Sequence, residues 1–202
     1  MTSVLMSDCV GSWRRTLLVN PDGSRDTTTD VRWLQGITVF VDSRGFGGWL
    51  NQRADVFEWS HFVNVQASEA HPDAAVMRWD DDTLIETGVY TDYVEHWERD
   101  LSAAASPCWA LTLCSAEGND ALLLRAGNQF GWMRRDTRVE VSLGRIDGAE
   151  WVITDSALPR RMGRSLRPTL DAGYLDVDDV DDNGTRTLRR WRIKDSEGSV
   201  KL

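Results

Sequence analysis

The chain has 202 residues, a formal net charge of −9 at pH 7 and 27% charged residues. This length allows one ordinary domain with a hydrophobic core or an internal cavity. The negative charge is spread along the chain without a block of lysine or arginine, which argues against nucleic acid and anionic membranes as partners.

The N-terminal stretch MTSVLMSDCVGSWRR lacks a basic region followed by a sustained apolar run, and 18 consecutive apolar residues occur nowhere. We therefore expect neither a signal peptide nor a transmembrane helix, and a cytoplasmic location. Cys9, Cys108 and Cys114 are odd in number and have no metal-binding or redox spacing, so buried reduced thiols are favoured.

The first half of the chain alternates apolar and polar residues with the period of a strand. The sequence NPDGS supplies a turn between the first two strands. A short helix is expected only at residues 48–56. The predicted strands lie at residues 13–19, 27–35, 37–42, 57–65, 76–80, 83–88 and 90–99.

Residues 101–107, LSAAASP, form a candidate internal junction, and short strands continue beyond them. The second-half strands are expected at residues 108–115, 120–126, 130–134, 137–143, 150–155, 170–178 and 185–194. Many short antiparallel strands with regular spacing predict an all-β barrel or sandwich. We expect one domain over residues 1–202, with additional strands in the second half as an elaboration of the barrel.

The first strand begins Gly11-Ser12-Trp13-Arg14-Arg15. In closed antiparallel barrels, a first-strand tryptophan can plug one end while an arginine of the last strand stacks on its ring. We expect that arginine to come from the final predicted strand, which contains four. Gly11-x-Trp13 resembles the N-terminal signature of lipocalins, and Thr91-Asp92-Tyr93 resembles their second conserved stretch.

A longer pattern is formed by WRRTLL (13–18), WLQ (33–35), VDSR (41–44), WDDDTLIETG (79–88) and YVEHWER (93–99). It resembles a calycin-like family of bacterial proteins whose fungal relatives interact with a casein-kinase-type protein kinase. The resemblance covers mainly residues 11–99 and departs from the family at VDSRGFGG. It implies a lipocalin-like barrel and carries no catalytic residues.

Charged side chains in apolar strands identify a candidate site. Glu86, Asp42 and Arg44 are costly to bury without partners, so they form either an internal salt bridge or a polar ligand contact. Glu86 and His96 are the candidate catalytic acid–base residues. The candidate ligand-binding residues are Trp33, Gln35, Arg44, Trp59, Tyr93 and Trp97.

Metal and cofactor sites are not expected. The three histidines, His61, His71 and His96, have no ligand spacing. The segment Asp179–Gly184 matches half of a calcium loop, but Arg190 stands where the bidentate glutamate belongs, so an acidic hairpin arm facing a basic arm is favoured. No phosphate-binding or nucleophile motif occurs.

Three functions fit these observations. The first is binding of a small apolar or aromatic molecule in a barrel cavity, with Arg44 and Glu86 fixing its polar end. The second is a cofactor-independent isomerase, cyclase or lyase in which Glu86 or His96 moves a proton. The third is a protein-binding adaptor. The ten tryptophans are either core residues or pocket walls, and the protein is expected to be a monomer or homodimer.

Overall fold

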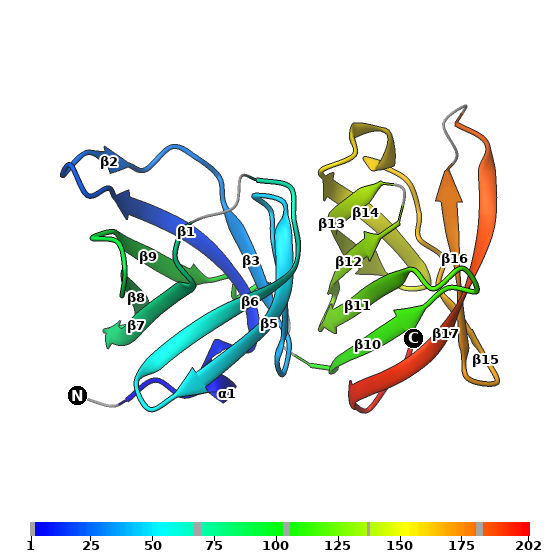
Figure 1. The fold of residues 1–202 in the computed structure, drawn as a ribbon, viewed down its shortest axis with the longest axis horizontal. Coiled ribbons are helices and arrows are strands. Elements are labelled where there is room, and N and C mark those ends of the chain that lie inside the picture. The colour runs from blue at the N-terminus through cyan, green and yellow to red at the C-terminus, as the bar shows by residue number, and fades with distance from the viewer. Residues whose placement is uncertain (1–2, 67–69, 103–105, 137, 181–183) are drawn as a thin grey trace.

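The computed structural model describes residues 3–66, 70–102, 106–136, 138–180 and 184–202. The predicted all-β fold is confirmed (Figure 1): the described helices are α1, Met6–Cys9, and the 3-10 helix η1, Pro159–Arg161. Part of the candidate junction at 101–107, and residues 181–183 of the calcium-like segment, lie outside the described residues. The assignment of one domain to residues 1–202 stays a prediction.

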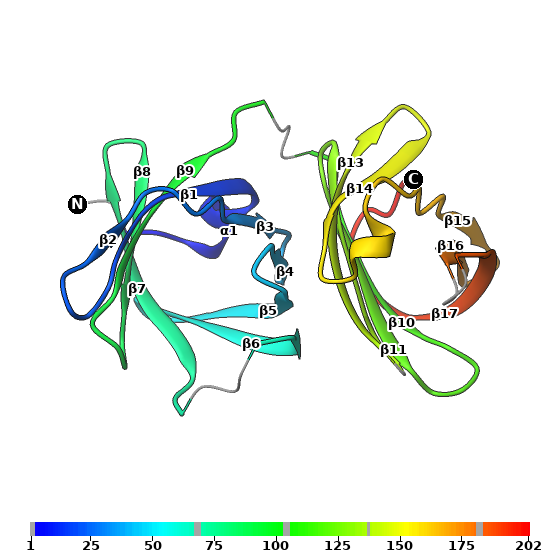
Figure 2. The same cartoon turned by 90° about the horizontal axis from the view of Figure 1, so that it is seen from above.

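The first half of the chain forms a closed antiparallel barrel of eight strands, to which short β2 adds an edge. The strands follow one another around the sheet, and β1 pairs with both β3 and β9, which closes it (Figure 2). The strands are β1 (Gly11–Val19), β2 (Arg25–Asp26), β3 (Arg32–Gln35), β4 (Val39–Asp42), β5 (Phe46–Arg53), β6 (Val56–Asn64), β7 (Asp73–Asp80), β8 (Thr83–Gly88) and β9 (Val94–Arg99).

The second half forms a curled antiparallel sheet in the order β14-β13-β12-β11-β10-β17-β16-β15. Residue Leu166 links β14 to β16, since its N–H donates to Trp151 and its carbonyl accepts from Asp178. The strands are β10 (Cys108–Cys114), β11 (Asp120–Ala126), β12 (Gln129–Arg135), β13 (Val139–Asp147), β14 (Glu150–Ser156), β15 (Thr169–Asp171), β16 (Tyr174–Val180) and β17 (Arg186–Gly198).

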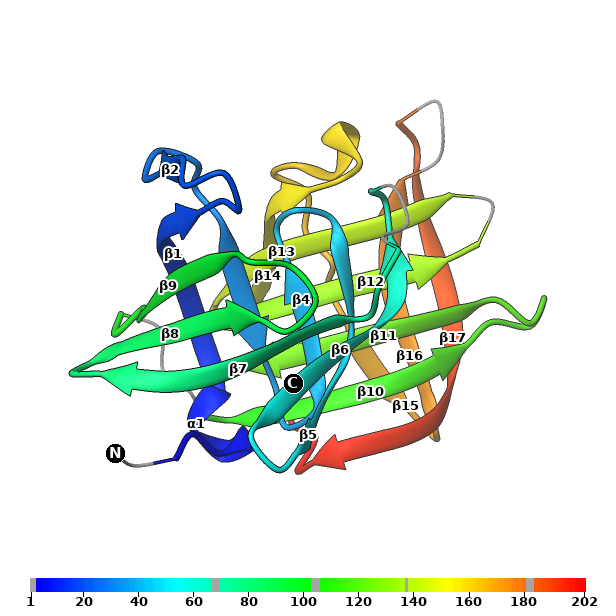
Figure 3. The same cartoon turned by 60° about the vertical axis from the view of Figure 1, so that its left-hand side comes forward.

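The two sheets pack against one another through a shared apolar cluster. In Figure 3 the barrel strands lie in front of the second sheet. All four residues of β4 are buried, because Val39 and Val41 contact the second sheet while Phe40 and Asp42 face into the barrel. The contact is close at Gly131 of β12, where a Cβ atom would lie 2.3 Å from Val41 Cγ1. A strand covered on both faces loses the alternation of a half-exposed strand.

The end of the barrel at the start of β1 is closed by Trp13 and α1. The Trp13 ring is buried, and its Nε1 donates to the Cys9 carbonyl at 2.6 Å. The guanidinium of Arg99, in β9, lies 4.2 Å from the ring centroid of Trp13. The expected plug is therefore present, but the assignment of its arginine to the final strand of the chain was wrong, because β17 belongs to the second sheet.

The short helix predicted at residues 48–56 is also wrong. Residues Phe46–Arg53 form β5, which pairs with β4 and β6. The register shifts between Gly47 and Gly48, and a Cβ atom on Gly48 would meet the Ser60 carbonyl oxygen at 2.0 Å. The extra residue of this bulge, Phe62, belongs to β6. Within β5 the sequence shows no strand period at Gly47 and Gly48, because neither residue has a side chain to mark an apolar face.

The predicted acidic and basic hairpin arms do face one another. In the β16–β17 pair, Asp176 lies opposite Arg190, and their side chains form an ion pair at 2.8 Å. Nearby, buried Glu140 accepts hydrogen bonds from Arg134 and Arg161, each at 2.7 Å.

Among the described residues, no helix is long and apolar enough to cross a membrane.

Replacing Trp13 with alanine should lower the free energy of unfolding by about 3–5 kcal/mol, because it removes a large buried ring and its contacts with Arg99 and α1. Urea denaturation of both proteins measures this change. A loss below about 1 kcal/mol would contradict the assignment of Trp13 as the barrel plug.

Candidate ligand-binding cavity

The barrel encloses a cavity of about 490 Å³. Its lining includes Asn20 and Pro21, directly after β1, and Thr91, between β8 and β9. The cavity therefore lies toward the end of the barrel opposite α1 and the Trp13 plug. A volume of this size falls in the range of pockets that hold small organic molecules.

Aromatic rings form much of the cavity wall. The Trp33 ring stands edge-on to Trp59 and Trp97, with centroid separations of 6.2 and 5.6 Å. Phe40 and Phe46 line the same cavity, with centroids 6.3 Å apart. These side chains come from β3, β4, β5, β6 and β9, so the rings surround the space rather than cover one side of it.

Two glutamates meet on the inner face of the β8–β9 hairpin. The strand register places Glu86 directly opposite Glu95, and both side chains are buried and line the cavity. Like charges directly across an antiparallel pair repel one another, and burial strengthens that repulsion. Only one of the two glutamates is readily ionised unless cations neutralise both.

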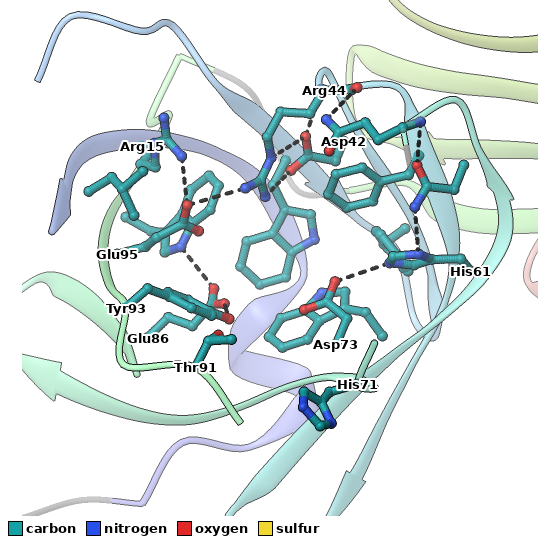
Figure 4. A pocket seen from close by; sticks show the side chains of 18 of the residues that line it. Arg15, Asp42, Arg44, His61, His71, Asp73, Glu86, Thr91, Tyr93 and Glu95 are labelled. Carbon is teal, nitrogen blue, oxygen red and sulfur yellow. Dashed lines mark hydrogen bonds and ion pairs between the residues drawn. The ribbon is translucent and has the colours of Figure 1, made fainter. Parts of the chain in front are cut away.

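The cations lie on one side of the pair, at Glu95. Arg15 Nη1 donates to Glu95 Oε1 at 2.6 Å, and Arg44 Nη1 donates to the same oxygen at 3.2 Å. Asp42 accepts hydrogen bonds from Arg44 Nε and Nη2, both at 2.9 Å (Figure 4). Although burial opposes its charge, the pKa of Arg44 is raised by Asp42 and Glu95. These contacts stabilise Glu95 as a carboxylate.

Glu86 therefore carries the proton. Burial and the charge of Glu95 raise the pKa of Glu86 from 4.5 to about 8, although the hydrogen bond from Tyr93 lowers it. Tyr93 Oη lies 2.7 Å from Oε1, and Trp97 Nε1 donates to Oε2 at 3.0 Å. Burial, together with the charge of Glu86, also raises the pKa of Tyr93. At pH 7 Glu86 is therefore a mostly neutral carboxylic acid that is hydrogen-bonded to the phenol group of Tyr93.

A second polar group lies on another wall of the cavity. His61 Nε2 is 3.0 Å from Asp73 Oδ2, and its Nδ1 is 3.2 Å from Asn64 Nδ2. The His61 ring also packs on Phe46, with centroids 4.9 Å apart. His61 and Asp73 are about one-quarter exposed, so this group lies closer to solvent than Glu86.

The structure brings together six of the eight predicted site residues. The cavity is lined by Trp33, Arg44, Trp59, Glu86, Tyr93 and Trp97. Gln35 is buried away from the lining, where its Oε1 accepts a hydrogen bond from Trp33 Nε1. His96 is also outside the lining, because neighbouring residues of a strand point to opposite faces and Trp97 points inward.

The sequence reasoning missed Glu95 and Arg15 as cavity residues. Strict alternation in the segment Val94–Arg99 could have found Glu95, since it shares a face with Trp97. Arg15 shares a face with Trp13 in β1, so the same rule applies to it. Asp73 had no comparable signal, because it stands at the very start of β7.

Among the described residues, no group of three or more histidine, cysteine, aspartate or glutamate side chains could hold a metal ion. Comparison of the chain with protein-family models, with curated proteins and with solved structures finds no match. Any functional argument therefore depends on the cavity itself.

The raised pKa of Glu86 should make stability depend on pH. In the unfolded chain the carboxyl ionises near 4.5, whereas in the folded protein it ionises near 8, so the stability of the folded form falls as the pH rises between these values. Relative to Glu86→Gln, which has no such group, the wild-type free energy of unfolding should fall by about 1.4 kcal/mol per pH unit from pH 5 to 8.

Urea denaturation of both proteins at pH 5, 6, 7, 8 and 9 measures this difference, and the effects of titrating groups that do not interact with Glu86 cancel in the comparison. A difference that does not change with pH would contradict a neutral Glu86 in the folded protein.

Proposed function

We propose that this protein binds a small, largely apolar or aromatic molecule inside its barrel, and that it belongs to the calycin-like family that its sequence resembles. The observation that carries the proposal is a cavity of about 490 Å³ with walls of tryptophan and phenylalanine and two polar groups, Glu86–Tyr93 and His61–Asp73. Pockets of this kind hold flat apolar ligands and orient them by a few polar contacts.

Different side chains contact the apolar and the polar parts of the ligand. The apolar part of the ligand packs against Trp33, Trp59 and Trp97, because burial of aromatic surface is the main favourable contribution to binding. Its polar end meets Glu86 and Tyr93. The Arg44 guanidinium is held by two carboxylates and by the Phe46 ring, 4.9 Å from its centroid, so it is a rigid part of the wall.

Three unpaired cysteines support the further proposal of a cytoplasmic location. Cys9 is buried, and Cys108 and Cys114 are partly buried. Proteins of reducing compartments commonly keep such thiols free.

Titration calorimetry with 2-(1-naphthyl)ethanol, a neutral aromatic alcohol, tests this binding. Trp59→Ala removes one wall and should weaken the affinity by about 10-fold or more, as expected for loss of an aromatic contact. Trp49→Ala is the matched control, because Trp49 packs against Phe62 outside the cavity and should leave the affinity unchanged. Binding that depends equally on both tryptophans, or no binding, would contradict the proposal.

A second candidate function is favoured by the environment of Glu86. A buried carboxylic acid with a pKa of about 8, hydrogen-bonded to a tyrosine and facing a cavity, is suited to proton transfer near neutral pH. The corresponding enzyme is a cofactor-independent isomerase, cyclase or lyase.

Glu86→Gln separates the two functions, because it keeps the shape of the side chain and removes its basicity. Recovery of cavity ligands after incubation in D₂O, followed by mass spectrometry, detects carbon-bound hydrogen exchange. An enzyme that uses Glu86 should exchange deuterium about 10²- to 10⁴-fold more slowly in the variant. Ligands recovered without deuterium from the wild type would support binding alone.

A further inference from the structure

The charges that line the cavity do not balance. The guanidinium groups of Arg15 and Arg44 are matched by carboxylates, since both contact Glu95 and Arg44 is also held by Asp42. Arg15 has a further ion pair with Asp26 at 3.4 Å. Both arginines are therefore satisfied within the protein, and neither needs an anionic ligand.

Two carboxyl groups remain without an arginine or lysine partner among the described lining residues. Glu86 accepts hydrogen bonds only from the neutral groups of Tyr93 and Trp97, and Asp73 contacts His61. They extend from neighbouring strands, β8 and β7, into the same cavity (Figure 4). A buried carboxyl without a cation is costly when ionised, so this part of the cavity favours a positive charge.

The aromatic walls favour a cation as well. The Arg44 guanidinium already lies over two cavity rings, 4.9 Å from the centroid of Phe46 and 5.9 Å from that of Trp97. The electron-rich faces of tryptophan rings attract cations, most strongly where water is excluded. Trp33 and Trp59 line the same space.

We propose that the ligand is a small aromatic amine, bound as its ammonium ion with the charge facing Glu86 and Asp73 and the ring packed among Trp33, Trp59 and Trp97. This inference deepens the proposed function and rests on it. An ammonium group supplies three N–H donors, so it can donate to Glu86 while the nearby charge of Asp73 attracts it.

Binding of such a cation should release one proton from the protein. Glu86 is mostly protonated at pH 7, and an ammonium ion beside it favours the carboxylate, so the Glu86 proton passes to solvent while the amine keeps its own charge. The titratable and charged groups that face this part of the barrel from the surrounding elements are Cys9, Arg15, Asp42, Arg44, His61, His71, Asp73, Tyr93 and Glu95. The variants below separate Glu86 from these groups.

Three probes of matched shape test the charge preference: 2-(1-naphthyl)ethylamine, 2-(1-naphthyl)ethanol and 1-naphthylacetate. In titration calorimetry at pH 9, the amine should bind about 10- to 100-fold more tightly than the alcohol, as expected for a hydrogen-bonded charge pair. Between pH 6 and 7.5, its affinity should rise about tenfold per pH unit and then level off above pH 8.5, with proton release visible in buffers of different ionisation enthalpy.

Two variants assign the effect. Glu86→Gln should abolish the pH dependence and remove most of the difference in affinity between the amine and the alcohol. Asp73→Asn is the second variant, because the Asp73 side chain is partly exposed and the fold should tolerate the substitution more easily. This variant should bind the amine more weakly and the alcohol with unchanged affinity. Asp80→Asn is the matched control on the same strand, since Asp80 is exposed and pairs with Arg78 outside the cavity.

The outcomes separate this inference from the proposed function. If the alcohol or the carboxylate binds at least as tightly as the amine at pH 9, the amine preference is overturned and the apolar binding function stands. If the affinity for the amine does not change between pH 6 and 9, proton release from Glu86 is overturned. If none of the three probes binds, both the inference and the proposed function fail.

Discussion

The distribution of charge in the cavity depends on one feature of strand register, the pairing of Glu86 with Glu95 across β8 and β9. Two carboxyl groups so placed on a buried face cannot both ionise without help. Arg15 and Arg44 both donate hydrogen bonds to Glu95, so the negative charge is stabilised there. Glu86 is the neutral glutamate of the pair. The chemistry of the site therefore follows from an unequal sharing of cations between two identical side chains.

Buried charges are paired differently in the two sheets, and the contrast supports the barrel as the place of the proposed ligand binding. In the second sheet, Glu140 contacts two arginines and the concave face is filled by a large apolar cluster. In the barrel, Arg15 and Arg44 contact Glu95 while Glu86 keeps only neutral hydrogen-bond partners around an open cavity. A filled interior with paired charges leaves no space for a ligand. An open cavity with an unpaired carboxyl group has space for a ligand that can form the missing polar contact.

The fold was largely predictable because most strands expose one face. Alternation identified strands such as β6, whose residues 57–60 are buried and exposed in turn, and turn residues marked the ends of the strands. It failed at β5, where Gly47 and Gly48 have no side chains to show which face is apolar. Alternation also could not assign the strands to two separate sheets. The outer residues of β4 are apolar because the second sheet covers them, and this contact joins Val41 to Gly131 across the two halves of the chain.

The site was predictable only where one strand or one hairpin determines it. Glu86 stands out because it interrupts an apolar strand, and the inward direction of Trp97 places Glu95 inward and His96 outward by alternation alone. The cations are different. Arg15 and Arg44 reach Glu95 across separations of 80 and 51 residues, which barrel closure by β1 and β9 brings into contact. Glu86 is neutral because it is buried in the closed barrel beside the charge of Glu95, which these distant arginines stabilise, so the local sequence cannot determine its protonation.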